Sequence, residues 1–298
     1  MSEAVSYLFD NIDNPLAGIV LYKPQKSTVH LVDLIKSQGC DVCAVINGNV
    51  SEEEKFLLEL AAVKLIIHDE NVGLAVALND IISYFLESEN THLFLFDQDS
   101  LPSPDFVFYM LEKFNKLEAD VSNIACLVPS IHDSKIGVIP HKYLQRNKTT
   151  LQTAMTSGCL FSKASFNAVG SMDDSLFIDG IDHEWCFRAQ SLGMNIYLCE
   201  EAILYHSLGD ISVMLGASRK QMHKNPIRHY YIVRNSFYLA RKKYIPWRWR
   251  LIEMLKTCRR AFAYPLMGKS FKLSLKMVFL GIMHGLMRRT GKLNKYPH

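Results

Sequence analysis

The sequence predicts an α/β protein built on a mixed, mainly parallel sheet with flanking helices. Two observations support this prediction. Short apolar runs of strand length alternate with segments of helical apolar spacing, which is the pattern of βαβ units. One of these runs ends abruptly in Asp97 and Asp99, and open α/β sheets bind their ligands outside the carboxyl ends of the strands.

The first part of the chain supplies the elements of this sheet in regular order. Apolar and β-branched runs of strand length lie at residues 17–22, 41–46, 64–68 and 93–97. Helices are expected between them, at residues 28–37, from Ser51 onward in capping-box order with Glu54, and at 71–86. Later strands are expected after the small-residue turn at 156–158, at 196–198 and at 202–205.

Composition places the chain among ordinary globular proteins. Of its 298 residues, 49% are hydrophobic and 21% charged, enough for one large α/β domain or two small ones. It shows no secretory signal and no apolar run of about 18 residues, so we expect no transmembrane helix. Most of the seven cysteines lie in apolar runs, as the reduced thiols of a cytoplasmic protein do.

Asp97 and Asp99 are the first candidate site residues. Residues two apart on a strand face the same side, so both carboxylates would point to one place while Gln98 points away. Two like charges held close together repel each other, and a divalent cation with oxygen ligands relieves that repulsion. The alternative is an ordinary polar turn, since Asp and Ser are common turn residues.

The carboxyl-terminal part of the chain is strongly basic. From Arg219 onward there are 20 Lys and Arg residues against the single acid Glu253, an excess of about +19. This charge accompanies a stripe of apolar residues from Trp247 and Trp249 to Phe262, and a second apolar segment at 271–287. Basic amphipathic helices of this kind lie on anionic membranes, and the alternative is a packed helix with a solvated basic face. Patterns of nucleic-acid-binding modules are missing, so no nucleic acid partner is expected.

The order of these motifs resembles a known enzyme family. A strand that leads into Asn47-Gly48, the segment Asn71-x-Gly73-x-Ala75-x-x-x-Asn79 and then Asp97-x-Asp99 resemble the nucleotide-sugar half of family 2 inverting glycosyltransferases of the GT-A fold. The sequence around Asp97 is similar to the bacterial rhamnosyltransferase branch. The resemblance covers roughly residues 15–240. It implies that the Asp-x-Asp pair binds Mg²⁺ or Mn²⁺ on the diphosphate of the donor.

The resemblance also implies a set of donor-binding residues. Ile46 stands where the family usually has an Asp that touches the base, so base recognition is expected to involve other residues, with Asp69 as a candidate. Arg234, followed by Asn235, resembles an Arg-Asn motif near the donor phosphate, although a helix facing solvent is the alternative. The expected donor-binding residues are Asn47, Asp69, Asn71, Gly73, Asn79, Asp97 and Arg234.

The segment from Asp179 to Arg188 resembles the family's Glu-Asp-x-Asp-x-x-x-Arg block. Alignment on Arg188 places the catalytic base at Asp182, with Glu184 in place of the second Asp of the block. The alternative is that these acids only cap a helix. Gly158, Glu184 and Trp185 are expected to bind the acceptor, and His206, which follows a strand, is expected as a third metal ligand or as a structural histidine.

These features together predict a cytoplasmic inverting glycosyltransferase on the inner face of the cytoplasmic membrane. Residues 1–240 would form the GT-A domain, with a donor half at about 15–105 and an acceptor and catalytic half at about 106–240, and residues 241–298 a membrane-association region. The resemblance implies transfer of L-rhamnose from dTDP-L-rhamnose to a lipid-linked glycan acceptor, for O-antigen or capsule. Open alternatives are another donor such as UDP-galactofuranose, a non-catalytic membrane scaffold of the same fold, and a glycosidase, which needs no cation.

Overall fold

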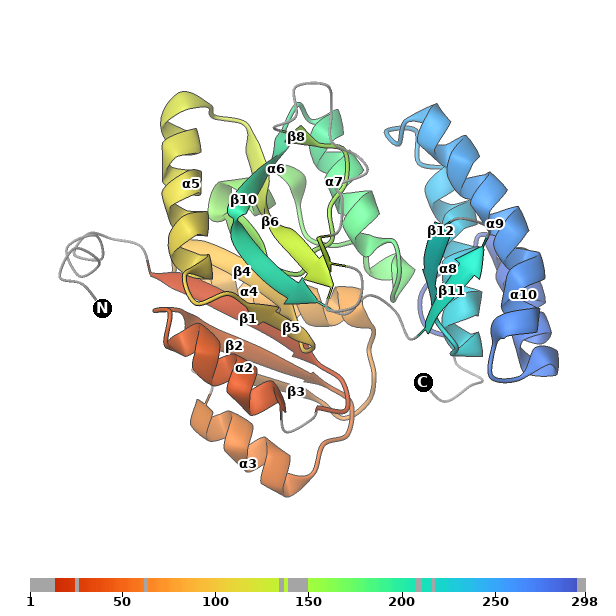
Figure 1. Cartoon of the computed structure of the whole chain (residues 1–298), viewed down its shortest axis with the longest axis horizontal. Helices are drawn as coiled ribbons and strands as arrows, with labels where there is room; N and C mark the ends of the chain where they lie inside the picture. The colour runs from red at the N-terminus through yellow and green to blue at the C-terminus, as the bar shows by residue number, and fades with distance from the viewer. Residues whose placement is uncertain are drawn as a thin grey trace.

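The computed structural model describes residues 14–24, 27–61, 64–133, 137–138, 150–206, 211–215 and 218–293. These residues form a mixed sheet with helices on both faces, and a group of three helices lies beside it (Figure 1). The sheet has the strand order β3-β2-β1-β4-β9-β6-β10-β5, with β7 paired to β6 and β8 paired to β10. The predicted mixed sheet with flanking helices is therefore confirmed.

One half of the sheet consists of four parallel strands. Because helices cover both faces, successive side chains of β1 enter two different apolar cores: Leu16 and Val20 face one core, and Ala17 and Ile19 face the other. This double burial explains why the strands appear in the sequence as nearly continuous apolar runs. The four strands, all predicted, are β1 (Pro15–Leu21), β2 (Asp41–Asn47), β3 (Lys64–His68) and β4 (His92–Asp97).

The other half of the sheet is mixed. Strand β9 is antiparallel to both β4 and β6, whereas β10 is parallel to β6. The two runs predicted at 196–198 and 202–205 form one long strand, β10, which is interrupted by a register shift between Cys199 and Ile203. The strands of this half are β5 (Ser100–Pro102), β6 (Ile124–Asp133), β7 (Gly137–Val138), β8 (Thr150–Leu151), β9 (Cys159–Ser162) and β10 (Asn195–His206).

Strand β5 lies at the edge of the sheet, where a proline costs no hydrogen bond within the sheet. Its pairing with β10 places Ser100 opposite His206. The chain therefore leaves β4 at Asp97, turns through two residues and returns along β10. This turn determines the direction of the Asp97 and Asp99 side chains.

Helices cover the two faces of the sheet. One apolar core packs α4, α6 and α7 against the sheet, and the other packs α2, α3 and α5. The amino-terminal ends of α4 and α7 lie near the carboxyl ends of the parallel strands, where the candidate site is found. The helices are α2 (Ser27–Lys36), α3 (Glu52–Ala61), α4 (Leu74–Glu87), α5 (Phe106–Asp120), α6 (Lys163–Val169) and α7 (Ile181–Ser191), with a 3₁₀ turn at Asp174–Leu176.

Three helices and a hairpin complete the described chain. Helix α8 packs against both α9 and α10, and the three stand together at one side of the sheet (Figure 1). Trp249 of α9 is buried and contacts Phe187 of α7, with ring centroids 5.0 Å apart, so this group also packs on the sheet domain. The elements are β11 (Ile211–Leu215), β12 (Ser218–Met222), α8 (Pro226–Ala240), α9 (Trp247–Met267) and α10 (Phe271–Leu286).

After α10 the chain runs back toward the sheet domain. The backbone N–H of Gly291 donates to the carbonyl of Ser175 at 2.7 Å, and that of Leu293 donates to the hydroxyl of Tyr231 at 2.9 Å. Leu293 is buried with Phe177 and Tyr231. We call residues 288–293 the return segment. Among the described residues, none of the helices is long and apolar enough to cross a membrane.

Candidate active site

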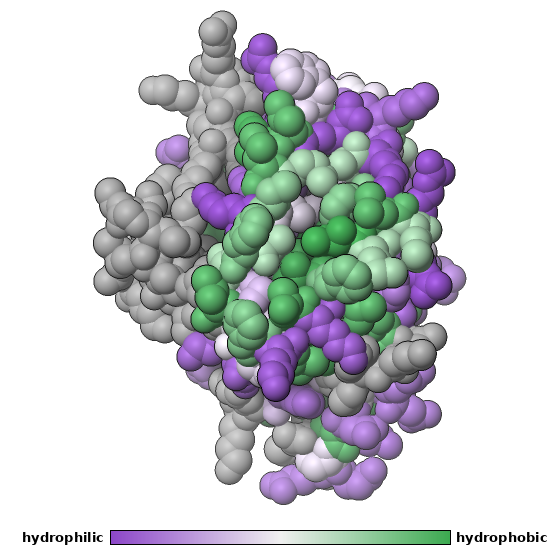
Figure 2. Space-filling view, turned by 90° about the vertical axis from the view of Figure 1, so that its right-hand side faces the viewer, coloured by the Kyte–Doolittle hydropathy of each residue, from purple (hydrophilic) through white to green (hydrophobic). Residues whose placement is uncertain are grey.

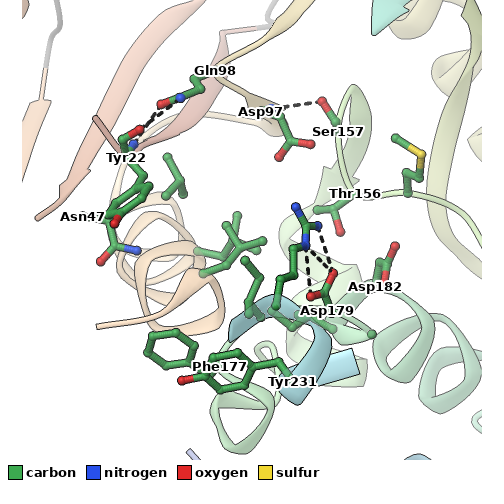
Figure 3. Close-up of a pocket in the computed structure, with 18 of the residues that line it drawn as sticks. Tyr22, Asn47, Asp97, Gln98, Thr156, Ser157, Phe177, Asp179, Asp182 and Tyr231 are labelled. Carbon is green, nitrogen blue, oxygen red and sulfur yellow. Dashed lines mark hydrogen bonds and ion pairs between the residues drawn. The ribbon is translucent and has the colours of Figure 1, made fainter. Parts of the chain in front are cut away.

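A cavity of about 810 Å³ opens at the carboxyl ends of β1, β2 and β4. Its other walls come from the amino-terminal ends of α4, α7 and α8 and from the end of β10. In Figure 3, Asp97 lies on one side of the cavity, and Asp179 and Asp182 lie on the other. The cavity therefore lies at the carboxyl ends of the parallel strands, where open α/β sheets bind their ligands.

Asp97, Asp99 and His206 converge on one wall of this cavity. Their ligand atoms all lie within 4.8 Å of one another. The imidazole Nε2 of His206 is 4.0 Å from Asp97 Oδ2, and its Nδ1 is 3.6 Å from Asp99 Oδ1. Two carboxylates and an imidazole are a suitable ligand set for Mn²⁺, and two carboxylates also suit Mg²⁺. The residues on this wall therefore fit a divalent cation.

The strand β4 ends earlier than the alternation of Asp97 and Asp99 along a strand requires. Asp97 ends the strand, and Gln98 and Asp99 form a turn instead of continuing it. Gln98 nevertheless points away from the two carboxylates: it accepts a hydrogen bond from the backbone N–H of Tyr22 at 2.8 Å and donates to the Tyr22 carbonyl at 3.1 Å. This pair of bonds ties the end of β4 to the end of β1 and fixes the direction of the turn.

Hydroxyl groups support the same wall from behind. Ser100 Oγ lies 2.8 Å from His206 Nδ1 and 2.7 Å from Ser157 Oγ, and Ser157 Oγ accepts the backbone N–H of Asp97 at 3.0 Å. These three side chains are largely buried, with His206 only 8% exposed. The Nδ1 atom of His206 is thus held by the Ser100 hydroxyl, just as the second ring nitrogen of a metal-binding histidine usually has a hydrogen-bond partner.

The electrostatics of Asp97 reflect its position among acids. Burial raises its pKa; Asp99 and Asp182 raise it further, whereas His206 and Arg228 lower it. Its side chain keeps 45% of its surface exposed to the cavity, so part of the desolvation is relieved by water. A cation bound between Asp97 and Asp99 would favour the charged carboxylate.

Asp182 lies in the first turn of α7, with its side chain on the cavity lining. The helix begins at Gly180, which has φ +88°. Asp182 Oδ1 accepts the backbone N–H of the neighbouring His183 at 2.8 Å, and this bond orients the carboxylate. Asp182 is therefore placed to accept a proton from a group bound in the cavity.

Asn47 and Asn71 also line the cavity. Asn47 Oδ1 accepts the backbone N–H of Val72 at 2.8 Å, and Asn71 Oδ1 accepts that of Gly73 at 2.9 Å. Gly73 lies just outside the lining, and a Cβ added there would come 2.6 Å from the Phe177 ring. Since Gly73 also has φ +99°, glycine is required for the start of α4 to approach the Phe177 loop.

Several other predicted site residues lie outside the cavity. Asp69 is exposed elsewhere, and the Asn79 side chain bonds both backbone groups of Met172, at 2.8 and 3.0 Å. A Cβ on Gly158 would come 2.8 Å from Leu204, so this glycine permits close packing. The structure thus places these three residues outside the cavity lining.

Glu184 and Trp185 also face away from the cavity. Glu184 is 1% exposed, bonds the Arg188 guanidinium at 2.9 Å and accepts the hydroxyl of Tyr244. Trp185 is 2% exposed and donates its Nε1–H to the carbonyl of Gly170 at 2.9 Å. Both residues stabilise the packing of α7, and neither lines the cavity.

The structure places Arg234 away from the cavity as well. It is 1% exposed and lies outside the lining. Its guanidinium donates to the carbonyl of Leu176 at 2.8 Å and to that of Gly291. Arg234 therefore joins the return segment to the loop before α7, and it does not line the cavity.

The cavity also contains residues that the sequence analysis did not assign. Phe177 and Tyr231 stack with ring centroids 4.8 Å apart, and Arg228 pairs with Asp179. The signals for both residues are in the sequence: Asp179 belongs to the acidic block, and Arg228 lies six residues before the Arg-Asn motif at Arg234. Only the fold shows which charged residue of each motif faces the cavity.

A cavity at the carboxyl ends of an α/β sheet, with an Asp-x-Asp wall facing an acid at a helix start, fits a glycosyltransferase of the GT-A fold. The chain belongs to glycosyl transferase family 2, whose family model matches residues 19–173. It is 32% identical over 243 residues to the dTDP-rhamnosyl transferase RfbF of Shigella flexneri, which covers 78% of this chain and 82% of RfbF. The predicted family is thus confirmed.

Solved structures show the same fold at low sequence identity. TarS of S. aureus, residues 1–349, has a TM-score of 0.55 at 12% identity, covering 93% of this chain and 80% of that one. GalNAc-T7, solved with UDP, GalNAc and Mn²⁺, has a TM-score of 0.52 at 15% identity, covering 90% of this chain and 56% of that one. Another TarS structure matches 84% of this chain, and this chain spans 44% of the length of that TarS chain. These likenesses support the GT-A fold prediction.

Proposed function

We propose that this glycosyltransferase is an inverting rhamnosyltransferase that transfers L-rhamnose from dTDP-L-rhamnose with Mg²⁺ or Mn²⁺. The observation that carries the proposal is the position of Asp182 across the cavity from Asp97, Asp99 and His206. The donor is proposed because RfbF, a relative over most of both chains, is described as a dTDP-rhamnosyl transferase.

In this proposal Asp182 acts as the general base. It takes the proton of an acceptor hydroxyl while the hydroxyl oxygen attacks the anomeric carbon, and the bond from that carbon to the diphosphate breaks. The attack comes from the face opposite the leaving group, so the configuration inverts and no covalent enzyme intermediate forms. A cation held by Asp97, Asp99 and His206 would supply positive charge to the departing diphosphate.

We propose Asn47 and Asn71 as donor-binding residues, because both line the cavity on the side of the nucleotide half. The ring of Tyr22, which is only partly buried, lies on the same side of the cavity as Asn47 (Figure 3). Aromatic side chains offer apolar faces to a nucleobase. We propose Tyr22 for the contact with the base, in place of Asp69.

A panel of nucleotide sugars tests this proposal. We expect hydrolysis or transfer with dTDP-L-rhamnose in the presence of Mn²⁺ or Mg²⁺, and loss of the activity in EDTA. Turnover of UDP-galactofuranose alone would establish the alternative donor, and failure with every sugar would favour a scaffold. Activity that survives EDTA would indicate a glycosidase, whose two carboxylates work without a cation.

We further propose that α9 and α10 hold the enzyme on an anionic membrane, where it meets a lipid-linked glycan acceptor. Figure 2 shows a broad apolar patch on this side of the molecule, bordered by hydrophilic residues. Each helix contributes exposed side chains at helical spacing, and Phe262 is 78% and Leu266 77% exposed. The exposed patch residues are Trp247, Leu251, Ile252, Leu255, Phe262, Leu266, Phe271, Leu275, Phe279 and Leu286.

The charges around the patch favour lipid over a protein partner. Arg248, Arg259, Lys269, Lys272 and Lys276 are exposed on or between the same two helices. Each Lys or Arg near an anionic surface contributes about 1 kcal/mol, so several together give substantial affinity. Apolar side chains flanked by cations match the interface of an anionic bilayer, with the acyl chains below the headgroups.

Removal of the most exposed patch residues is expected to abolish membrane binding. A triple variant, Phe262→Ser, Leu266→Ser and Phe279→Ser, should float with anionic vesicles at least about tenfold less than wild type, because each side chain loses its transfer into the interface. High salt should weaken flotation of the wild-type protein. Donor hydrolysis should persist, since none of the three residues lines the cavity.

Leu192→Ser is the matched control, because Leu192 is 56% exposed outside the patch. It should float like wild type. Equal flotation of the triple variant and wild type would contradict the assignment of the patch. Equal flotation of wild type on neutral vesicles would show that the basic residues contribute little.

A further inference from the structure

We propose that Arg228 is the catalytic residue that binds the diphosphate of the donor, and that Asp179 positions it. This inference rests on the proposed function, because it assumes a nucleoside diphosphate sugar in the cavity. It replaces the predicted role of Arg234 with that of a residue two helical turns earlier. Among the described residues that line the cavity, Arg228 is the only Lys or Arg.

Arg228 enters the cavity from the first turn of α8. The helix begins with Asn225, whose side chain caps the backbone N–H of Ile227 at 3.0 Å, followed by Pro226. Both residues favour a defined helix start. The guanidinium of Arg228 is thereby placed at the cavity from a rigid element, and a rigid element gives a catalytic group its precision.

Asp179 holds this guanidinium by three contacts. Arg228 Nε is 3.1 Å from each Asp179 oxygen, and Nη2 is 2.9 Å from Oδ1, as the dashed lines at Asp179 in Figure 3 mark. A guanidinium carries five N–H donors, so one carboxylate does not exhaust its capacity. The pair can therefore hold the cation in a fixed orientation while it binds a phosphate.

The backbone of Asp179 is itself held in an uncommon conformation. Asp179 has φ +66° and Phe177 has φ +64°, a region that residues other than glycine seldom occupy. Such backbone persists where its surroundings hold it, often at functional sites. Here Asn235 Nδ2 donates to the carbonyls of Ile178 at 2.7 Å and Asp179 at 2.8 Å.

Helix α8 thus carries both the cation and the support of its partner. Arg228 lies at its first turn, and Arg234 and Asn235 lie two turns later, bonded to the loop that contains Asp179. This arrangement gives the Arg-Asn motif a role: it positions the loop, and the loop positions Arg228. Arg234 and Asn235 are accordingly positioning residues.

The charges in the cavity show why a second cation is needed. Four carboxylates line it, from Asp97, Asp99, Asp179 and Asp182. A divalent cation bound by Asp97 and Asp99 is balanced by those two groups alone. The donor diphosphate adds negative charge, and more develops on it as the bond to the sugar breaks. An arginine fork that binds phosphate oxygens stabilises this charge.

A merely structural ion pair fits these observations less well. The side chains are 36% and 17% exposed, and partly solvated pairs contribute little to stability. Arg228 shares one cavity with the wall of Asp97 and Asp99 and with Asp182. Arg228 therefore acts on the space between the two walls, where the diphosphate would lie.

The test compares a phosphate ligand with one that has none. Inhibition of donor hydrolysis by dTDP and by thymidine would be measured for the full-length protein with Mn²⁺. We expect Arg228→Gln to weaken dTDP about 10–100-fold and thymidine less than about threefold, because only the phosphates contact the guanidinium. Turnover should fall more than the affinity for donor, since charge grows on the leaving group. Arg228→Lys should restore part of both losses.

Two further variants separate a direct role from a structural one. Lys224→Gln removes a charge of the same sign just before α8, outside the cavity lining. It should change neither the inhibition constant of dTDP nor that of thymidine. Asp179→Asn should weaken dTDP about 3–10-fold. The double variant, Asp179→Asn with Arg228→Gln, should bind dTDP no more weakly than Arg228→Gln alone, because Asp179 acts through Arg228.

The outcomes are distinct. Unchanged inhibition by dTDP in Arg228→Gln, or equal losses for dTDP and thymidine, would overturn the assignment. Additive effects of the two substitutions would overturn the positioning role of Asp179. If neither dTDP nor UDP inhibits or binds the wild-type protein, the proposed function fails, and the Arg228 assignment fails with it.

Discussion

Asp99→Asn is expected to lower turnover of the donor by about 10²–10³-fold and to shift the dependence on Mn²⁺ to higher concentration. The substitution keeps the shape of the side chain and removes one charged ligand from a hard cation. Removal of one group that stabilises transition-state charge costs a factor of this size. Asp99 is suited to the test because its side chain is 57% exposed, so its loss should not disturb the core.

The measurement is initial rate against Mn²⁺ concentration for wild type and variant. Asp105→Asn is the matched control: it makes the same chemical change near the same turn, on an exposed residue outside the cavity lining. The control should behave as wild type. Near-normal turnover of Asp99→Asn at low Mn²⁺ would contradict a metal site at Asp97, Asp99 and His206. Asp97→Asn should resemble Asp99→Asn, since Asp97 shares the cation.

Asp182→Asn is expected to lower turnover by about 10²–10⁴-fold, the usual contribution of general base catalysis. The amide cannot accept the proton of the acceptor hydroxyl. Metal-dependent binding of the donor should be spared, because Asp182 lies on the wall opposite the metal ligands. Binding of donor by calorimetry and turnover with acceptor separate these two effects.

Glu184→Gln provides the contrast for Asp182. It removes a charge from the same first turn of α7, but this carboxylate faces Arg188 and Tyr244 and not the cavity. We expect a loss of about 1–3 kcal/mol in the free energy of unfolding and a milder loss of turnover. If Glu184→Gln lost more turnover than Asp182→Asn, the base would be assigned to the wrong carboxylate.

The sequence sufficed for the sheet and for the convergence of Asp97 and Asp99. Parallel strands covered on both faces leave apolar runs that need no tertiary information to find. Asp97 and Asp99 were expected to face one point because of strand alternation. They do converge, but through a two-residue turn that the hydrogen bond of Gln98 to Tyr22 holds, and not through the alternation of a strand.

The direction of individual side chains was beyond the sequence. The Arg-Asn motif indicates that Arg234 has a fixed partner, but not whether that partner is a phosphate or a backbone carbonyl. The fold decides this, because the return segment and the loop before α7 cover Arg234 from both sides. Arg228 faces the cavity from the same helix.

The two tryptophans of α9 show the same limit. Trp247 and Trp249 were placed on one apolar stripe, yet Trp247 is 62% exposed and Trp249 only 6%. Residues two apart on a helix point in nearly opposite directions, so one meets solvent while the other packs on α7. Composition identifies the amphipathic helices, but it does not say which of two neighbouring tryptophans packs on the sheet domain and which is left exposed.

The return segment has a consequence for the order in which the protein is made. Gly291 and Leu293 support Ser175, Phe177 and Tyr231 and are translated about a hundred residues after the loop. Nascent domains fold as their residues leave the ribosome, amino-terminal elements first. The parallel half of the sheet can therefore form early, whereas the loop that contains Ser175 and Phe177 lacks these contacts until Leu293 has left the ribosome. Ribosome-bound chains halted before that point should fold their nucleotide half without acquiring a competent site.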